Sequence, residues 1–337
     1  MNPGKIILKT VLLTLSIFLS NAKTNDTEDK YMFDDFYTNK RVLITGGCGF
    51  IGSHIAEKLV ELGAQVTILD DLSTGFIENI TPFKDRLSVV YDSICNQETC
   101  NRVTQNQDII FHLAAFISVP ESIEKPYKCH EINVDGTVNL LEAARKNMVK
   151  RFIFSSSCAV YGPKDGRCSE SDACAPTSPY GMSKLVGELY CAQYANHFDM
   201  TTVMLRYFNV FGPRQNPHGQ YAGVVAKFTE QMKHNKPITI FGDGSQTRDF
   251  VPVDEVVYAN LLVGMAPQEL VRAHMFNIAT GNSINLLELK DLLQKKYPDF
   301  SGQTIFKPAR SGDVQQVYAD CTRFAHLKSY VPTNCSR

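Results

Sequence analysis

Residues 41–52, Arg-Val-Leu-Ile-Thr-Gly-Gly-Cys-Gly-Phe-Ile-Gly, decide the fold of this chain. The apolar run over 41–45 predicts a buried strand, and a helical pattern continues to Leu62, where Gly63 ends it. Glycines let the backbone approach a pyrophosphate, and the free N–H groups at a helix start favour its charge. The turn has the spacing Gly-x-x-Gly-x-x-Gly. The dinucleotide contacts predicted here are Gly46, Gly49, Phe50, Ile51 and Gly52.

The next strands extend this pattern. The run over 65–69 predicts a second strand that delivers Asp70 about twenty residues after the glycine turn, where a carboxylate binds a ribose diol and repels the 2′-phosphate of NADP. NAD is therefore favoured. A further strand over 108–115 ends in small residues, among them Ala114, which allow close approach of the cofactor. His112, near the end of this strand, is either a catalytic base or, more commonly at such a position, a packing residue.

Candidate catalytic side chains follow a later strand. Residues 151–154 predict a strand that stops at three serines, Ser155 to Ser157, and this places hydroxyls at the carboxyl edge of a parallel sheet, where ligands bind. A predicted helix from Pro179 to Asn196 then carries Tyr180 and Lys184 on one face. A neighbouring ammonium favours the phenolate, so we expect the pKa of Tyr180 to fall toward the range of a general base.

Composition excludes several classes of protein. The 337 residues are 44% hydrophobic and 20% charged, which is typical of a globular protein. A net charge of -1 supplies no basic field for nucleic acid. The ten cysteines show no metal-ligand spacing, so we predict no metal site and interpret most of them as small buried hydrophobic residues.

The first 40 residues differ from the rest. An apolar run over 6–19 follows Lys5 and precedes small residues, so segment 1–22 resembles a signal peptide or a short membrane anchor. The alternative is an apolar extension packed on the domain. Residues 23–40 are polar and acidic at their start, and we interpret them as a linker. A leader of this kind predicts a secretory or membrane-tethered location.

Taken together, these motifs resemble the extended short-chain dehydrogenase/reductases, and within them the UDP-glucose 4-epimerase group of nucleotide-sugar 4-epimerases. The resemblance covers about residues 41–333. It includes the glycine turn, the segment Asp70 to Gly75, the serine strand with the Tyr180/Lys184 pair, and the stretches 206–215, 242–250 and 310–314.

The resemblance implies an α/β fold: a doubly wound Rossmann sheet over 41–205, with a return segment near 253–277, and a smaller mixed α/β substrate domain over 206–252 and 278–333. It implies a cytoplasmic, NAD-dependent enzyme that acts on a UDP-sugar, and a homodimer formed by the helices that start near Asn133 and Tyr180. The implied catalytic residues are Ser157, Tyr180 and Lys184. Asp71, Ser73, Ala114, Tyr180 and Lys184 join the cofactor contacts already given. The implied substrate contacts are Ser118, Ser156, Ser157, Asn209, Arg248, Arg310, Asp313 and Val317.

Carried over from the family, the reaction inverts C4 of a UDP-hexose through a 4-keto sugar. The related dehydratases carry Asp-Glu at the positions of Cys158 and Ala159, and the related decarboxylases carry Glu at the position of Ala159. This chain has no carboxylate at either position. Val317 corresponds to a gatekeeper that is Tyr in members restricted to UDP-glucose and UDP-galactose, so N-acetylated substrates are expected to fit. The alternatives are a UDP-glucuronate 4-epimerase or decarboxylase, and a non-catalytic protein that binds NAD or a nucleotide sugar.

Overall fold

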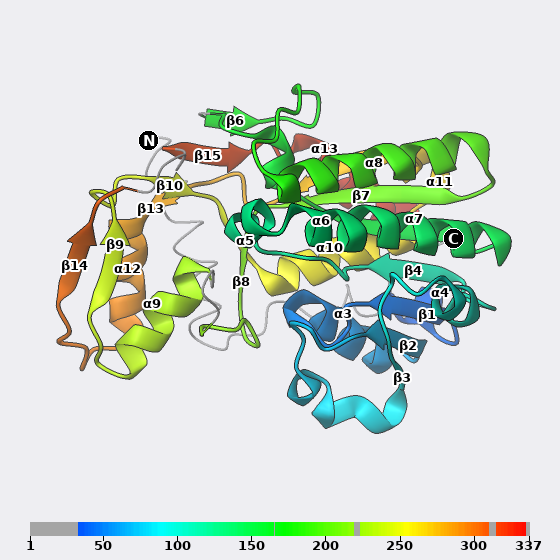
Figure 1. Cartoon of the computed structure of the whole chain (residues 1–337), viewed down its shortest axis with the longest axis horizontal. Coiled ribbons are helices and arrows are strands. Elements are labelled where there is room, and N and C mark those ends of the chain that lie inside the picture. The colour runs from blue at the N-terminus through cyan, green and yellow to red at the C-terminus, as the bar shows by residue number, and fades with distance from the viewer. Residues whose placement is uncertain (1–32, 165, 219–222, 310–314, 335–337) are drawn as a thin grey trace.

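The computed structural model describes residues 33–164, 166–218, 223–309 and 315–334. Its larger part is an α/β layered unit, and a smaller part built of short strands and two helices lies beside it (Figure 1). The predicted fold class is confirmed.

A seven-stranded parallel sheet forms the centre of the larger part. Its strand order is β12-β7-β5-β4-β1-β2-β3, so the chain winds outward in both directions from its middle strands. The strands are β1 (Arg41–Thr45), β2 (Gln65–Asp70), β3 (Ser88–Tyr91), β4 (Ile109–His112), β5 (Arg151–Ser157), β7 (Thr201–Tyr207) and β12 (His274–Ile278).

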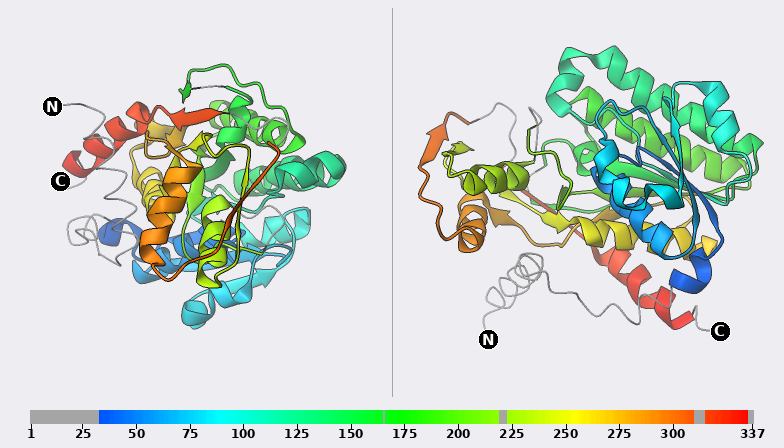
Figure 2. Two further views of the ribbon diagram at one scale, coloured as in Figure 1. Left: turned by 90° about the vertical axis from the view of Figure 1, so that its left-hand side faces the viewer. Right: turned by 90° about the horizontal axis from the view of Figure 1, so that it is seen from below.

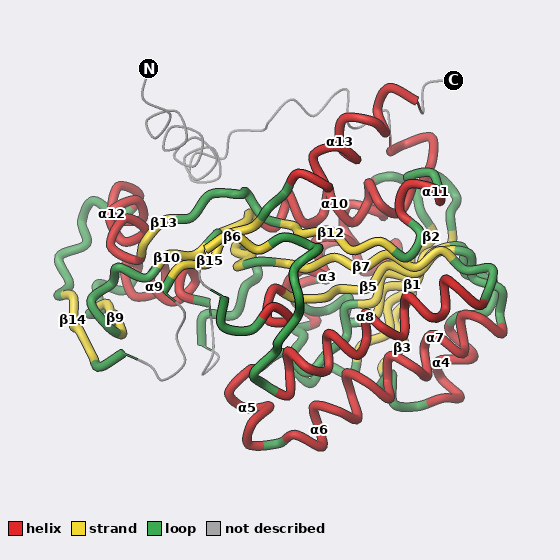
Figure 3. Tube along the Cα trace, turned by 90° about the horizontal axis from the view of Figure 1, so that it is seen from above, coloured by secondary structure: helices red, strands yellow, loops and turns green. Residues whose placement is uncertain are grey.

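Helices cover both faces of this sheet (Figure 3). One face carries α3 (Phe50–Glu61), α10 (Val253–Met265), α11 (Gln268–Val271) and α13 (Thr322–Asn334). The other carries α4 (Gln97–Val103), α7 (Gly136–Lys146) and α8 (Pro179–His197). Shorter helices join these elements: η1 (Ile77–Asn79), η2 (Thr81–Arg86), α5 (Val119–Glu124), α6 (Pro126–His130), the π-helical η3 (Glu131–Asp135) and η4 (Cys158–Tyr161).

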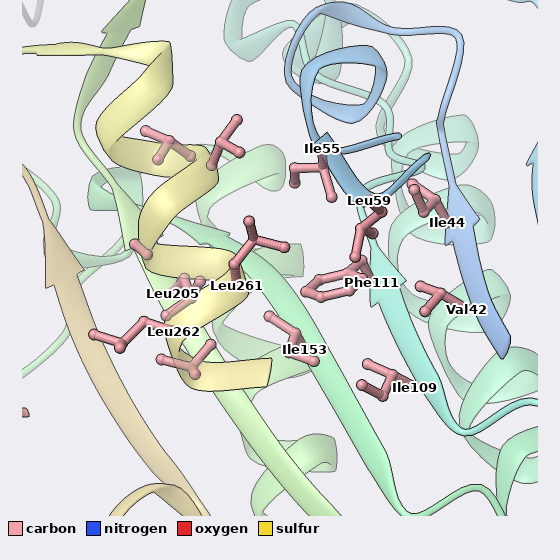
Figure 4. Packing of buried hydrophobic residues seen from close by; sticks show 14 of the residues in the cluster. Val42, Ile44, Ile55, Leu59, Ile109, Phe111, Ile153, Leu205, Leu261 and Leu262 are labelled. Atoms are coloured by element: carbon pink, nitrogen blue, oxygen red, sulfur yellow. The ribbon is translucent and has the colours of Figure 1, made fainter. Parts of the chain in front are cut away.

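The period-two alternation of the strands fills both cores. Val42 and Ile44 of β1 pack in the cluster under α3 and α10, whereas Leu43 between them packs under α4, α7 and α8. Figure 4 shows the first cluster, in which Ile55 and Leu59 of α3 and Leu261 of α10 meet the strand residues. Burial on both faces holds the sheet rigid, so the ends of its strands are fixed positions for a site.

The smaller part contains three small sheets (Figure 2). A four-stranded sheet has the order β13-β10-β15-β6, and the pairs β11–β8 and β14–β9 stand apart from it. The elements are β6 (Gly166–Cys168), β8 (Asn209–Phe211), α9 (Val224–Lys233), β9 (Ile238–Phe241), β10 (Thr247–Arg248), β11 (Phe250–Pro252), β13 (Ile284–Asn285), α12 (Leu286–Lys296), β14 (Thr304–Lys307) and β15 (Gln316–Ala319).

The expected linker over 23–40 is wrong at its C-terminal end. Residues 33–37 are helical, and Phe33 and Tyr37 are buried in the core beneath α10. The Tyr37 hydroxyl donates a hydrogen bond to the Leu261 carbonyl at 2.7 Å. The polar residues at the start of the segment suggested a linker, but two aromatic residues nearer its end are part of the core. Segment 1–22 lies outside the described residues.

The expected domain boundaries also need correction in two places. Strand β6 lies inside the range 41–205 but pairs with β15 in the small sheet. Helix α13 lies inside the range 278–333 but packs on β12, with Phe324 and Leu327 in the core of the larger part. Each segment follows the sheet that buries its apolar side chains and not its place along the chain. Within the described ranges, no helix is long and apolar enough to cross a membrane.

Candidate active site

The glycine turn forms a close-fitting cradle at the carboxyl end of β1. Gly46 has a φ of +71°, and a Cβ atom there would lie 2.7 Å from the Ala114 nitrogen of the loop after β4. A Cβ atom on Gly52 would lie 2.2 Å from the Gly46 carbonyl oxygen. Helix α3 starts at Phe50 with no side-chain cap, so its first N–H groups have no intrahelical partner and point at the turn. These features fit the pyrophosphate of a dinucleotide.

Asp70 is tied to this cradle. Its two carboxylate oxygens accept hydrogen bonds from the backbone N–H groups of Cys48 at 2.8 Å and Leu72 at 2.9 Å. Burial raises the pKa of Asp70, and the two hydrogen bonds oppose that rise. Asp71 accepts from the Ser73 N–H at 2.9 Å, which closes the loop after β2. Each Asp70 oxygen keeps a second lone pair. The carboxylate therefore stands at the end of β2 beside the turn, the place expected for a ribose contact.

The three candidate catalytic residues meet at the end of β5. Strand β5 runs three residues past the last pair that it forms with β4, so Ser155 to Ser157 pair only with β7. The Ser157 hydroxyl accepts from the Ala159 N–H at 3.2 Å and lies near enough to Tyr180 of α8 to act on the pKa of its phenol. The Lys184 ammonium donates to the Ser155 carbonyl at 2.8 Å and lies 5.9 Å from the centroid of the Tyr180 ring. The tertiary structure thus brings together three side chains from two elements.

The electrostatics of this group differ from the sequence expectation. Burial raises the pKa of Tyr180 to about 12, and the hydrogen bond from Ser157 opposes part of that rise. Burial lowers the pKa of Lys184 to about 8, with nearby thiols and Glu188 acting in the opposite direction. The expected lowering of the Tyr180 pKa by Lys184 is wrong for this structure. The ammonium is committed to a backbone carbonyl, and loss of water from the phenol outweighs its effect.

Ser156 has a buried partner in the structure. Side chains alternate along a strand, so Ser156 points to the face opposite Ser157. Its hydroxyl donates to Glu188 of α8 at 2.5 Å, and only 3% of the residue is exposed. The hydroxyl already has a buried carboxylate as its partner, and the predicted substrate contact by this side chain stays a prediction. Sequence reasoning missed Glu188; its position four residues after Lys184 on the same helix face was the available signal.

The predicted substrate residues come from four places. Val317 of β15 and Arg248 of β10 are direct partners in the small sheet, and both are half-buried. The Asn209 amide donates to the Asp249 carbonyl at 3.1 Å. The Ser118 oxygen caps α5 by accepting from the Glu121 N–H at 3.1 Å. Arg310 and Asp313 lie outside the described residues.

His112 is a packing residue. Its two ring nitrogens lie 2.7 Å from the Thr45 hydroxyl and 2.9 Å from the Thr137 hydroxyl, and both threonines are buried. Burial, with a smaller contribution from Lys184, lowers the pKa of His112 to about 3. The ring is therefore neutral and locked between two strands and α7, and it is not the catalytic base.

Two further residues organise the site and were not singled out from the sequence. Asp249 is fully buried and accepts hydrogen bonds from Thr280, Gly281 and Ala319, which joins β10 to β15 and to the loop after β12. Asn133, in the π-helical turn, bonds the backbone of Phe116 in both directions and donates to the Ser183 hydroxyl at 2.9 Å. A buried polar residue shows its partners only in the folded chain.

The nine cysteines within the described ranges are free thiols, and Cys48, Cys100, Cys129, Cys168 and Cys191 are buried. No group of three or more His, Cys, Asp or Glu side chains among the described residues is arranged to hold a metal ion. The groups that the structure does place at the candidate site are the glycine cradle and the Ser157, Tyr180 and Lys184 side chains.

A doubly wound sheet with a dinucleotide cradle and a Ser–Tyr–Lys group at its carboxyl edge defines a nicotinamide-dependent enzyme of the short-chain dehydrogenase/reductase class. Within that class, the chain belongs to the NAD dependent epimerase/dehydratase family, whose model matches residues 42–279. NAD is its cofactor.

Relatives with defined names narrow the family further. A UDP-glucose 4-epimerase of Mycolicibacterium smegmatis is 38% identical over 87% of this chain and 93% of its own length. A Thermotoga maritima UDP-glucose 4-epimerase solved with UDP-glucose superposes with a TM-score of 0.81, at 38% identity over 86% of this chain and 92% of its own. A UDP-N-acetylglucosamine 4-epimerase of Methanobrevibacter ruminantium, solved with UDP-N-acetylmuramic acid, gives 0.82, at 34% identity over 86% and 92%. The chain is therefore similar over most of its length to UDP-sugar 4-epimerases.

Proposed function

We propose that this protein inverts the configuration at C4 of a UDP-hexose, with UDP-glucose and UDP-N-acetylglucosamine as the leading substrates. The observation that carries the proposal is the meeting of Ser157, Tyr180 and Lys184 at the end of β5, beside the glycine cradle. A hydroxyl, a phenol and an ammonium at one strand end are what removal and return of a hydroxyl proton requires.

In this proposal each side chain has one task. Tyr180 takes the proton of the sugar 4-hydroxyl and later returns it, and Ser157 hydrogen-bonds the same oxygen. Lys184, held by the Ser155 carbonyl, keeps a positive charge beside the Tyr180 ring while the phenol is ionised. NAD, when bound, supplies the acceptor for the C4 hydride and returns it, so no net oxidation occurs. Inversion follows when the 4-keto sugar turns its other face before the hydride returns.

The residues after Ser157 favour epimerisation over its relatives' reactions. Elimination or decarboxylation needs an additional acid or base, and Cys158 and Ala159 provide no carboxylate. Burial raises the pKa of the Cys158 thiol to about 12, so this thiol stays protonated at neutral pH. A decarboxylase acting on UDP-glucuronate is the second candidate, and release of carbon dioxide would identify it.

Substrate choice is proposed to depend on Val317. This side chain packs in the same cluster as Cys158, the residue next to catalytic Ser157, and it pairs with Arg248, the proposed diphosphate ligand. Val is smaller than Tyr, so the space beside it accommodates an acetamido group. Val317→Tyr is expected to lower turnover of UDP-N-acetylglucosamine relative to UDP-glucose by about 10-fold. An unchanged ratio would remove Val317 as the gatekeeper.

A second copy of the chain is the proposed partner of α8. Met182 and Leu189 on this helix are 50% and 59% exposed, and Ile123 of α5 and Tyr127 of α6 extend the apolar surface on helices that pack beside it. Light scattering of the wild type should give twice the mass of one chain, and Leu189→Glu should shift it to one. A monomeric wild type would contradict the dimer.

The deciding experiment is a proton NMR time course of purified protein with UDP-glucose, UDP-N-acetylglucosamine and UDP-glucuronate in separate tubes, without added NAD. Appearance of a 4-epimer would establish the reaction, identify the sugar, and show that NAD co-purifies. No product in any tube, with NAD found in the denatured protein, would favour a protein that binds NAD without turnover.

A further inference from the structure

A buried ion pair lies on the side of β5 that faces away from the catalytic hydroxyl. Glu188 of α8 and Arg206 of β7 are joined at 2.7 and 2.8 Å, and their side chains are 4% and 3% exposed. Ser156, which is the direct partner of Arg206 across β5 and β7, donates to the same carboxylate. We call these three residues the serine clamp. It ties one helix and two strands together at the edge of the sheet.

The clamp continues the catalytic face of α8. Tyr180, Lys184 and Glu188 follow one another at four-residue intervals and lie on one side of the helix. Two of them bond the serines directly, Lys184 at the Ser155 carbonyl and Glu188 at the Ser156 hydroxyl, and Tyr180 lies near the Ser157 hydroxyl. The strand end thus meets the helix at three consecutive serines, and two of the helix residues involved, Tyr180 and Lys184, belong to the proposed catalytic group.

Neighbouring contacts leave the clamp little freedom. Helix α8 lies so close to β5 that a Cβ atom on Gly187 would be 2.4 Å from the Phe154 ring. The Arg206 guanidinium lies 4.8 Å from the centroid of the Tyr161 ring and donates to the Cys174 sulfur at 3.3 Å. Tyr161 in turn donates to Asn277 at 2.7 Å. The clamp is therefore backed by side chains of β12 and of the loop that follows β5.

A buried ion pair is a poor source of stability, because loss of hydration offsets its attraction. Its better-supported use is to select one arrangement among several. Rotating β5 about its axis, or sliding it along α8, would separate the Ser156 hydroxyl from the carboxylate and leave a buried hydroxyl without its partner. The same movement would carry Ser157 away from Tyr180, since the two serines are adjacent.

We propose that Ser156 and Glu188, with Arg206 as the counter-ion, are positioning residues that fix Ser157 against Tyr180. This inference rests on the proposed function for its catalytic consequence. The claim about geometry is independent of it, because the Ser157 to Tyr180 contact can be measured in a protein that turns over no substrate.

The first test is Ser156→Ala, which removes the hydroxyl and leaves the Glu188–Arg206 pair intact. We expect kcat to fall about 10- to 100-fold, with KM and NAD content within twofold of wild type, because misplacement acts on the reacting geometry and not on binding. Ser156→Thr, which restores a hydroxyl, is expected to recover most of kcat. A higher KM for the UDP-sugar with an unchanged kcat would overturn the proposal, because that result is expected of a side chain that contacts the substrate.

Thr202→Val is the matched control. Thr202 of β7 is equally buried, and its hydroxyl donates to the Cys191 carbonyl of α8 at 2.6 Å, farther along the helix from Tyr180. This variant also removes a strand hydroxyl bonded to α8, so it reports the effect of lost stability alone. We expect its kcat to stay within twofold of wild type. Equal losses of kcat in Thr202→Val and Ser156→Ala would mean that the serine clamp affects kcat only through stability and does not position Ser157.

A crystal structure of Ser156→Ala separates this proposal from the proposed function. We expect the Ser157 hydroxyl to lie farther from the Tyr180 hydroxyl than it does in a crystal structure of the wild type, and an unchanged distance would overturn the positioning role whatever the activity. Should Ser156→Ala fail to fold, Glu188→Gln is measured in its place, since this side chain keeps one oxygen for Ser156. The same result is expected: a lower kcat, with KM and NAD content within twofold of wild type. A wild type that epimerises no UDP-sugar would refute the proposed function and leave the crystallographic result to decide the clamp.

Discussion

The end of the large sheet where we propose catalysis and the four-stranded small sheet are built differently. Strands β5 and β7 have seven residues each, and the serines at the end of β5 are held by α8 at three successive positions. In the small sheet, β10 and β13 have two residues each, and Arg248 and Val317 are half-buried. The larger part therefore holds the reacting groups rigidly, and the smaller part presents side chains on short elements.

This difference matches the two demands of the proposed reaction. Proton and hydride transfer requires groups fixed within fractions of an ångström, which buried and hydrogen-bonded side chains provide. Binding a nucleotide diphosphate while the sugar turns requires a firm hold on one end only. The small sheet keeps its own firm point in Asp249, whose carboxylate is buried under four hydrogen bonds directly after Arg248.

The largest effect is expected at the rigid end. Tyr180→Phe removes the proposed base, so kcat should fall by about 100- to 10,000-fold while NAD and UDP-sugar still bind. Rates are measured by proton NMR and NAD by its release on denaturation. Tyr190→Phe makes the same change on an exposed part of α8 and should leave kcat unchanged. Turnover of Tyr180→Phe within twofold of wild type would remove Tyr180 as the base.

At the small sheet the effect should fall on binding. Arg248→Ala is expected to raise KM for the UDP-sugar about 10- to 100-fold, because a hydrogen bond to a charged group contributes about 1.5–3 kcal/mol, while kcat changes less. Arg167→Ala is the control, since Arg167 lies in the same sheet and pairs with Asp320 at the surface. A large fall in kcat with an unchanged KM would contradict the assignment of substrate binding to the small sheet and of catalysis to the large sheet.

Helix placement gives a prediction for stability. Gly187→Ala inserts a methyl group against the buried Phe154 ring, so the free energy of unfolding should decrease by about 1–3 kcal/mol. Because α8 carries Tyr180, kcat should fall with it. Urea unfolding measures the first effect, with the exposed Gln193→Ala on the same helix as the control. An unchanged free energy of unfolding would show that α8 and β5 can move apart enough to accommodate the methyl group.

The smallest effect concerns pH. His112 has a folded pKa of about 3 against an ordinary value of 6.5, so between these pH values the unfolded chain binds a proton that the folded chain does not. Stability should therefore decrease as pH falls below 6.5, by up to about 1.4 kcal/mol per pH unit from this group. His112→Gln should remove that part of the slope in urea unfolding at pH 7.5, 6.5 and 5.5. Exposed His326→Gln should keep it, and equal slopes in all three proteins would contradict the assignment.

Local patterns were sufficient to predict the glycine turn between β1 and α3 and the placing of Tyr180 and Lys184 on one helix. The glycine turn with Asp70, and Tyr180 with Lys184, depend on backbone freedom and on helix spacing, both of which are written in neighbouring residues. The order of strands and helices likewise predicted the doubly wound sheet. The same reasoning failed for the pKa of Tyr180, because desolvation depends on everything packed around the phenol.

By itself, the sequence determined the fold class, the NAD cradle and the residues available for proton transfer, since each follows from chemistry within a few positions along the chain. Only the tertiary structure decided that Ser156 turns to Glu188, that Phe33 and Tyr37 belong to the core, and that β6 and α13 pack with elements far away in sequence. The physical reason is that burial and hydrogen-bond partners are properties of the assembled layers, and no local pattern records which distant surface will cover a side chain.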